Sequence, residues 1–179
     1  MMNELPTPLS LPDGRMVQLR HATVEDAADL REIERQIIEE ARSIVTDEAT
    51  PIDAWRRDLA RDKGGDLWLV AAAGTHAVGL LKLQRPAPRY LHHQRFLSVE
   101  LHRDYRGVGL GSAMMDAAVR WSRDKGVTLI TLGVLDSNAR AKRLYERLGF
   151  VTCGYIPTFV RLPDGRYVGN SEMMRQLDA

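Results

Sequence analysis

The segment Arg106-Gly107-Val108-Gly109-Leu110-Gly111 constrains the fold of this chain more than any other. A short apolar run, Phe96–Leu101, precedes it, and a segment with helical periodicity, 110–125, follows it. A strand, a glycine turn and a helix in that order bring several backbone N–H groups and the positive end of a helix to one point. Arg106 adds a permanently charged guanidinium beside the turn. A ligand that carries a diphosphate is therefore the first hypothesis.

Two common phosphate-binding motifs do not fit this turn. A P-loop requires Gly-Lys-Ser/Thr, whereas Gly111 is followed by Ser112-Ala113. A dinucleotide fingerprint requires a further glycine near position 112 and an acid at the end of the next strand, and the candidate strand Thr128–Val134 contains no acid. A nicotinamide enzyme is thereby disfavoured, and a short glycine turn that merely closes a strand–helix corner stays open at this stage.

Composition narrows the class of protein. With 179 residues, 44% of them apolar, the chain suits one globular domain, and 25 basic against 24 acidic residues give no field that favours nucleic acid or an anionic membrane. The first residues lack a secretory pattern, and the longest apolar run, Leu67–Ala73, is too short to cross a bilayer. A cytoplasmic protein is expected. A single cysteine, Cys153, excludes an intrachain disulfide and a cysteine-cluster zinc site.

Periodicity and turn residues divide the chain into alternating strands and helices. Residues 1–13 hold three prolines and no apolar period, so we expect a loose N-terminal arm, with 14–179 as a single domain. Helices are predicted after Thr23 and Thr50, over 110–125 and over Asn138–Leu148. The predicted strands are Val17–Arg20, Leu67–Ala73, Val78–Leu83, Phe96–Leu101, Thr128–Val134, Val151–Val160 and Tyr167–Met174.

A second motif lies after the glycine turn. Asn138 and Tyr145 are seven residues apart on a predicted helix, so they lie on one face roughly 10 Å apart. Asn138 is also a plausible N-cap, and Tyr145 also suits the edge of a core. Together, downstream of an Arg-x-x-Gly-x-Gly turn and an intervening strand, they favour a shared function.

These two motifs together resemble the GNAT superfamily of N-acetyltransferases. The match is Arg106-x-x-Gly109-x-Gly111, followed by Asn138-x-x-Ala141-x-x-Leu144-Tyr145-x-x-Leu148-Gly149-Phe150. The resemblance implies an α/β fold: a mixed, mostly antiparallel twisted sheet, splayed at the cofactor site, with helices on both faces. It also implies acetyl-coenzyme A (acetyl-CoA) as cosubstrate and no metal. The residues implied for the cofactor are Val99, Leu101, Arg106, Gly107, Val108, Gly109, Leu110, Gly111, Ser112, Asn138 and Tyr145.

Acetyl transfer requires an oriented thioester, a neutral amine, a donor for the developing oxyanion and an acid for the sulfur. The resemblance assigns the acid to Tyr145, and a phenol with a pKa near ~10 stays protonated beside a thiol of ~8.5. Glu100, on the strand beside the expected cofactor groove, is the first candidate base, and His102 is the second. A solvated or ion-paired carboxylate is an equally simple interpretation of Glu100. Cys153 is interpreted as a buried structural residue rather than a nucleophile.

The sequence does not identify the acceptor beyond a primary amine of a small molecule or peptide. The segment Glu34–Ala49 mixes acids with apolar residues, which suits a cationic amine and equally suits an amphipathic surface helix. Lys142, Arg143 and Arg147 form a basic face that is either solvated or contacts the ribose phosphate. Adjacent His92 and His93 point apart in an extended chain and make a poor metal pair. The last strand, with its apolar methionines, suggests a possible homodimer. A non-catalytic acyl-CoA-binding or regulatory module is the alternative function.

Overall fold

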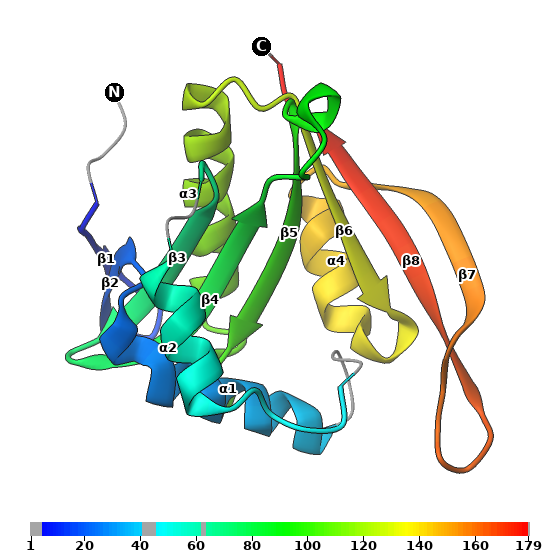
Figure 1. The fold of residues 1–179 in the computed structure, drawn as a ribbon, viewed down its shortest axis with the longest axis horizontal. Coiled ribbons are helices and arrows are strands. Elements are labelled where there is room, and N and C mark those ends of the chain that lie inside the picture. Colours follow the sequence, from blue (N-terminus) through cyan, green and yellow to red (C-terminus); the bar gives the residue numbers. More distant parts are fainter. Residues whose placement is uncertain (1–4, 41–45, 62–63, 179) are drawn as a thin grey trace.

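The computed structural model describes residues 5–40, 46–61 and 64–178, and it confirms the predicted α/β fold class. One eight-stranded sheet runs through the molecule in the order β1-β2-β3-β4-β5-β6-β8-β7 (Figure 1). The strands are β1 (Thr7–Ser10), β2 (Met16–His21), β3 (Leu67–Ala73), β4 (His76–Gln84), β5 (Gln94–Leu101), β6 (Leu129–Leu135), β7 (Val151–Arg161) and β8 (Tyr167–Gln176). Every neighbouring pair is antiparallel except β5 and β6, which run parallel.

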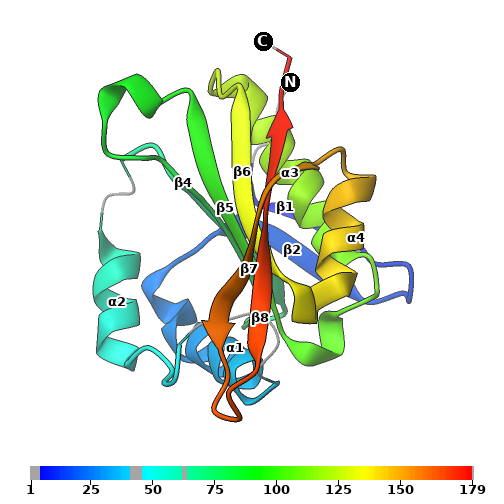
Figure 2. The same ribbon diagram turned by 90° about the vertical axis from the view of Figure 1, so that its right-hand side faces the viewer.

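Four α-helices cover the two faces of the sheet (Figures 1 and 2). They are α1 (Ala27–Glu40), α2 (Ile52–Ala60), α3 (Leu110–Asp124) and α4 (Ala139–Arg147). Short 3-10 turns precede α1 and α4 and follow β5, at Val24–Asp26, Asp136–Asn138 and Arg103–Tyr105, and a fourth lies at Arg89–Leu91. No helix among the described residues has the length and apolar character needed to cross a membrane.

The helices form two separate hydrophobic cores because each buries one apolar stripe against one face. On one side, α1 and α2 pack Leu30, Ile33 and Trp55 against Val70 and Leu80 of the sheet. On the other side, α3 and α4 form the larger core, whose members include Met114, Met115, Ala118, Ile130, Leu132 and Tyr145. β5 lies between the two cores, so its alternate side chains face different halves of the molecule.

The sheet opens between β5 and β6. The parallel ladder joins only Gln94 to Leu129, Arg95 to Ile130 and Phe96 to Thr131, all at the beginning of the two strands. Beyond Phe96, β5 stays paired with β4 up to Leu101, whereas β6 stays paired with β8 up to Leu135. The carboxyl half of β5 therefore presents an unpaired edge to the opening, as the resemblance implied.

Two expectations about the ends of the chain are wrong. Part of the predicted loose arm is a strand, because Thr7–Ser10 pairs antiparallel with β2 and the following Leu11 is buried in the core. The three prolines indicated a loop, so the sequence did not predict this edge strand. The last strand is not at an edge, because β8 lies between β6 and β7, and Met173 is buried. A dimer cannot form through β8, and β7 is the edge strand instead.

Candidate active site

The opening beside β5 exposes main-chain groups of two predicted cofactor residues. The N–H of His102 donates to the carbonyl of Val78 on β4 at 3.0 Å. Because successive N–H groups in a strand point to opposite sides, those of Leu101 and Val99 point away from β4 and into the opening. Their side chains pack against the α3–α4 core. This edge can accept an extended chain that carries amide groups, which is how an added strand binds a sheet.

The glycine turn lies at the mouth of the opening. Gly107 and Gly109 have φ angles of 81° and 87°, in the left-handed region that favours glycine. Helix α3 begins at Leu110, with Gly109 as its N-cap. Among the described residues, no chain acceptor binds the N–H groups of Gly109, Leu110, Gly111 or Ser112. These free donors and the helix dipole form an anion-binding turn.

Close packing fixes the position of this helix start. A Cβ atom at Gly111 would lie 3.4 Å from methyl carbons of Leu101 and Leu144, which is ordinary van der Waals contact, so α3 packs closely against both β5 and α4 at this point. Val108 and Leu110 contribute side chains to the core beneath the turn. The turn residues predicted from the sequence therefore lie together at one site, and the core side chains packed beneath the turn support it.

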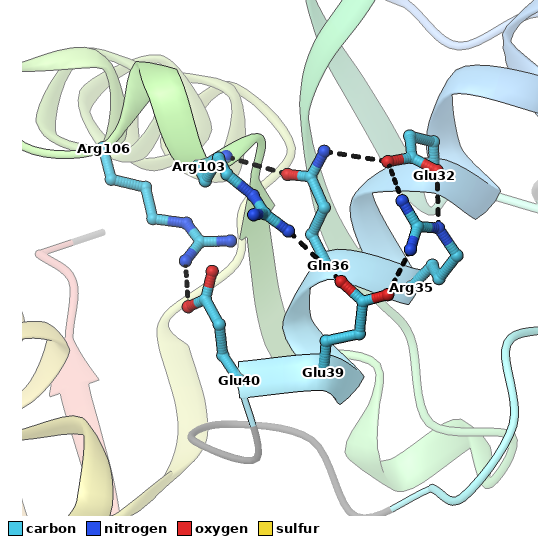
Figure 3. Close-up of polar contacts among 7 residues, drawn as sticks. All are labelled: Glu32, Arg35, Gln36, Glu39, Glu40, Arg103 and Arg106. Atoms are coloured by element: carbon cyan, nitrogen blue, oxygen red, sulfur yellow. Dashed lines mark hydrogen bonds and ion pairs between the residues drawn. The ribbon is translucent and has the colours of Figure 1, made fainter.

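The guanidinium of Arg106 does not point freely at this turn. Its Nε donates to the carbonyl of Leu101 at 2.9 Å, and its Nη1 forms an ion pair with Glu40 at the end of α1 (Figure 3). Its Nη2 is buried without a hydrogen-bond partner among the described residues. Glu40 therefore neutralises much of the charge that Arg106 brings to the turn. Arg106 instead ties the end of β5 to α1.

Further contacts hold the last turns of α1 against the segment after β5 (Figure 3). The N–H of Arg103 donates to Gln36 Oε1 at 3.1 Å, and the Arg103 guanidinium pairs with Glu39 at 3.3 Å. Arg35 pairs with both Glu32 and Glu39. Sequence reasoning missed this network because Arg103 and Arg106 lie more than sixty residues from their partners on α1. Acids and amides repeating on one face of α1 were the only sequence indication.

Helix α4 carries the second motif on the other side of the opening. Asn138 is the N-cap of α4, and its Oδ1 accepts from the Ala141 N–H at 3.2 Å. Tyr145 is buried, with its ring centroid 5.8 Å from that of Phe150. Burial raises the pKa of the Tyr145 phenol to about 12. The phenol therefore keeps its proton at any physiological pH and is available as a hydrogen-bond donor and general acid.

Arg140, which sequence reasoning missed, lies directly over the glycine turn. A side chain at Gly107 would collide with the Arg140 guanidinium, so the two segments are in contact. Of the basic face singled out from sequence, Lys142 donates to Ser171 Oγ at 2.9 Å, and Arg143 and Arg147 are exposed. The cation beside the glycine turn is thus Arg140, at the beginning of α4 next to the N-cap. The spacing of residues along the helix does not distinguish it from the other basic residues of α4.

Glu100 lies on the opposite side of β5 from Val99 and Leu101. It pairs in register with Leu80 and faces the α1–α2 half of the molecule. Burial raises the pKa of its carboxyl group, and the negative charge of Glu34 adds to the increase, although Lys82 opposes it. A carboxylate with a raised pKa is a better proton acceptor than a solvated one. The other candidate, His102, uses Nδ1 to accept from the Asp104 N–H at 3.3 Å.

Several acids expected to attract a cationic amine are already occupied. Glu34 is buried and accepts from the Thr50 N–H and hydroxyl and from Trp55 Nε1. Glu39 and Glu40 pair with arginines. These three carboxylates therefore already have partners within the protein, and Ile44 lies outside the described residues.

Two smaller expectations concern cysteine and histidine. Cys153 was expected to be buried, but it is exposed on the edge strand β7, so that interpretation is wrong. His92 and His93 each contact a nearby main-chain carbonyl. Across 5–40, 46–61 and 64–178 no group of three or more possible metal ligands is found.

A mixed sheet opened between two parallel strands, with a glycine turn at the mouth and a helix on either side, defines an α/β protein of the acetyltransferase class. The chain belongs to the acetyltransferase (GNAT) family, whose model matches residues 27–150. A GCN5-related N-acetyltransferase from Kribbella flavida superposes with a TM-score of 0.80 and 25% identity, covering 90% of this chain and 98% of that one. The structure of yncA from Salmonella typhimurium with acetyl-CoA has a TM-score of 0.80 and 24% identity, covering 91% and 95%.

Curated relatives match shorter segments. The L-amino acid N-acyltransferase MnaT of Escherichia coli (strain K12) is 32% identical over 81 residues, which are 45% of this chain and 46% of the relative. The mycothiol acetyltransferase of a Parafrankia species is 50% identical over 44 residues, which are 25% of this chain and 14% of the relative. The matched segment spans less than half of either relative.

Proposed function

We propose that this protein is an N-acetyltransferase that moves the acetyl group of acetyl-CoA to a primary amine of a small molecule or peptide. Its main support is the run of free N–H groups at Gly109–Ser112, located where the sheet opens between β5 and β6. Family membership and a neighbouring fold solved with acetyl-CoA agree with this cosubstrate. The relatives named for L-amino acids and for streptothricin agree with a small acceptor.

The predicted cofactor residues suit three parts of the thioester carrier. The free N–H groups of the glycine turn would bind the diphosphate, with Arg140 as an additional cation. The exposed main-chain groups of Val99 and Leu101 would pair with the amides of the pantetheine arm. Arg106 would act indirectly, by fixing the Leu101 carbonyl and the start of the turn. Asn138 and Tyr145 would contact the carrier from α4.

The proposed reaction is a direct attack in a ternary complex. The acceptor loses a proton to Glu100, directly or through water, and its nitrogen lone pair attacks the carbonyl carbon of the thioester. The carbon–sulfur bond then breaks, the new amide nitrogen releases its remaining extra proton to solvent, and Tyr145 donates its proton to the departing thiolate. The products are the N-acetylated amine and free CoA thiol. The proton held by Glu100 then passes through solvent to the Tyr145 phenolate, which regenerates both side chains. The unpaired N–H of Val99 or Leu101 would stabilise the developing oxyanion.

The need for a base depends on the acceptor. Deprotonating a lysine-like amine at pH 7 costs about 4–5 kcal/mol, whereas an α-amine near ~7.8 costs only about 1 kcal/mol. A carboxyl group with a raised pKa, such as Glu100, is adequate for an α-amine. The position of Glu100 on the acceptor side of β5 therefore favours an α-amine over a side-chain amine.

The decisive experiment follows free thiol while acetyl-CoA is incubated with a panel of amines. Thiol release that depends on both partners, together with a product heavier by one acetyl group, is the expected result. Binding of acetyl-CoA by calorimetry without thiol release from any acceptor would favour the acyl-CoA-binding module instead. An acetylated protein that forms and decays on the reaction path would contradict direct attack.

A homodimer is still proposed, but through the edge strand β7. β7 exposes Val151, Tyr155, Ile156 and Phe159, and an unpaired edge with apolar side chains is a template for a second copy of the same strand. Sedimentation of the wild type and of Ile156→Lys measures this directly. A wild-type monomer at high concentration would rule it out.

A further inference from the structure

Lys82 is a cation without an ionic partner beside the proposed acceptor site. It lies half-buried on β4, and its Nζ is 5.6 Å from the ring centroid of Trp55 and 5.3 Å from that of Trp68. Within the described ranges, no carboxylate lies within ion-pairing distance of this ammonium group. The two indole rings attract the ammonium group, and such contacts do not neutralise its charge.

A second polar group without a partner lies next to it. Ser98 on β5 is directly opposite Lys82 in the antiparallel register, so the two side chains leave the sheet on the same face. The Ser98 hydroxyl is buried and has no hydrogen-bond partner among the described residues. A buried hydroxyl normally finds a partner, and one that lacks it among the described residues, beside an ammonium group, is a candidate donor for a ligand.

The position of this pair relative to Glu100 restricts what the ligand is. Glu100 lies two residues beyond Ser98 on the same face, which corresponds to about 7 Å along the strand. One end of the site therefore holds a proton acceptor, and the other end holds a cation and a hydroxyl donor. In an α-amino acid the amine and the carboxylate are separated by a single carbon. One such molecule can therefore place its amine beside Glu100 and its carboxylate beside Lys82 and Ser98.

We propose that Lys82 and Ser98 bind the carboxylate of the acceptor, so that the preferred acceptors are α-amino acids. The proposal rests on the acetyl-transfer function proposed above and adds the class of substrate. The ammonium of Lys82 and the Ser98 hydroxyl donate to the carboxylate, which places the α-amine beside Glu100. A polyamine would bring a second positive charge close to Lys82 and would be rejected by repulsion.

The test compares each of several L-α-amino acids with its carboxamide and with the amine that lacks the carboxyl group altogether. Kinetics of thiol release are measured for the wild type, Lys82→Met, Lys82→Arg and Ser98→Ala. Lys125→Met is the matched control, because Lys125 is exposed at the end of α3. The wild type is expected to prefer the amino acid over its carboxamide by about 10- to 100-fold in kcat/KM, the range expected of one charged hydrogen-bonded contact.

Lys82→Met is expected to abolish this preference, mainly through a higher KM for the amino acid, while the KM for acetyl-CoA stays unchanged. Any change in kcat that arises because Lys82 no longer lowers the pKa of Glu100 should be shared by the amino acid and its carboxamide. Lys82→Arg should retain most of the preference. Ser98→Ala should lower kcat/KM about fivefold for the amino acid and leave kcat/KM for the carboxamide unchanged. Ser98→Ala also tests the site if Lys82→Met fails to fold. Equal use of amino acids, carboxamides and polyamines by the wild type would overturn the inference while leaving acetyl transfer intact. No thiol release with any amine would overturn the proposed function and this inference with it.

Discussion

The two sides of β5 present different kinds of chemical group to the ligands that we propose for them. On the side of α3 and α4, the site consists mainly of main-chain groups from two contiguous segments, the turn after β5 and the start of α4. On the side of α1 and α2, it consists of isolated side chains from β4, β5 and α2. Main-chain recognition requires particular residues at fixed spacing, and side-chain recognition does not. The first side therefore leaves a motif in the sequence, and the second leaves only scattered polar residues.

The largest expected effect lies on the acceptor side. Glu100→Gln removes the proposed base and is expected to lower kcat/KM for acetyl transfer by about 10²- to 10⁴-fold, the range typical of general base catalysis. The affinity for acetyl-CoA should not change, because Glu100 faces away from Val99 and Leu101. Steady-state kinetics and calorimetry measure the two quantities. Glu146→Gln, an exposed acid on α4, is the control, and a loss of acetyl-CoA affinity in Glu100→Gln would contradict the division between the two sides.

The same variant should be more stable than the wild type at neutral pH. The pKa of Glu100 is raised in the folded protein, chiefly by burial, so the folded state binds this proton more tightly than the unfolded state does. Stability must then fall as pH rises from the ordinary glutamate value through the raised pKa. Glutamine removes that loss. Melting curves of both proteins should coincide near pH 4 and separate by pH 7, with the variant melting higher.

The next effect lies on the cofactor side. Tyr145→Phe is expected to lower kcat by about 100-fold with little change in acetyl-CoA affinity, because only the donated proton is lost. Its matched control is Tyr155→Phe, since Tyr155 is exposed on β7 and donates to Asp136. Single-turnover measurements report the chemical step. Unchanged turnover in Tyr145→Phe would remove Tyr145 from the acid role.

Alkaline pH provides an independent test of Tyr145. Its pKa of about 12 in the folded protein exceeds the ordinary value of 10.0, so the folded state retains the proton over this interval. The stability linked to Tyr145 is complete below pH ~10 and is lost as pH rises to ~12. Denaturant unfolding of Tyr145→Phe should therefore depend less on pH between these values. A parallel dependence in both proteins would show that the phenol is ionised at its ordinary pKa.

The contrast between the two sides also explains what could be predicted from the sequence. The strands and helices of the core followed from periodicity, because amphipathic stripes such as that of α3 record which face is buried. β1 was missed, since an edge strand tolerates the prolines that mark a loop. The sequence also did not show that β8, rather than β7, pairs with β6. The two strands of a hairpin have the same sequence pattern whichever of them pairs with the rest of the sheet.

Within the site, the residues of the glycine turn and of α4 were found together because their spacing is set by backbone geometry. Glu40 and Arg140 were not found, since each acts through a contact with a segment that is distant in sequence. The ion pair of Arg106 was not found for the same reason. Its position beside the turn is visible in the sequence, but its partner on α1 is not. Lys82 became informative only once its neighbours on β5 and α2 were known.

A smaller effect distinguishes the anion-binding turn from backbone strain alone. Gly109→Ala and Gly165→Ala place alanine at nearly equal φ angles, 87° and 86°, so the backbone strain of each should cost about 1 kcal/mol of stability. At Gly109 the new Cβ atom would also lie 3.2 Å from Pro12, so this variant should lose somewhat more stability, whereas no atom lies within 4 Å at Gly165. Gly109 begins α3 beside the free N–H groups, and Gly165 lies in the exposed turn between β7 and β8. Only Gly109→Ala should weaken acetyl-CoA binding, by about tenfold in calorimetry. Equal affinities in the two variants would show that the turn does not hold the diphosphate.

The smallest expected effect concerns the one ion pair that joins the two sides directly. Glu40 on α1 holds Arg106 at the start of the glycine turn, and both side chains are only 26% exposed. Glu40→Gln keeps the shape and removes the charge, so we expect stability to fall by about 0.5–1 kcal/mol and the KM for acetyl-CoA to change by about two- to fivefold. Glu39→Gln is the matched control, because Glu39 is its neighbour on α1 and pairs with Arg103 rather than with Arg106. A double-mutant cycle with Arg106→Lys isolates the pair.

The same variants test whether α1 transmits the state of the turn to the acceptor side. If it does, the acceptor KM in Glu40→Gln will no longer depend on the acetyl-CoA concentration. In Glu39→Gln the acceptor KM will depend on it as in the wild type. An identical dependence in all three proteins would mean that the two sides act independently and that the ion pair is purely structural.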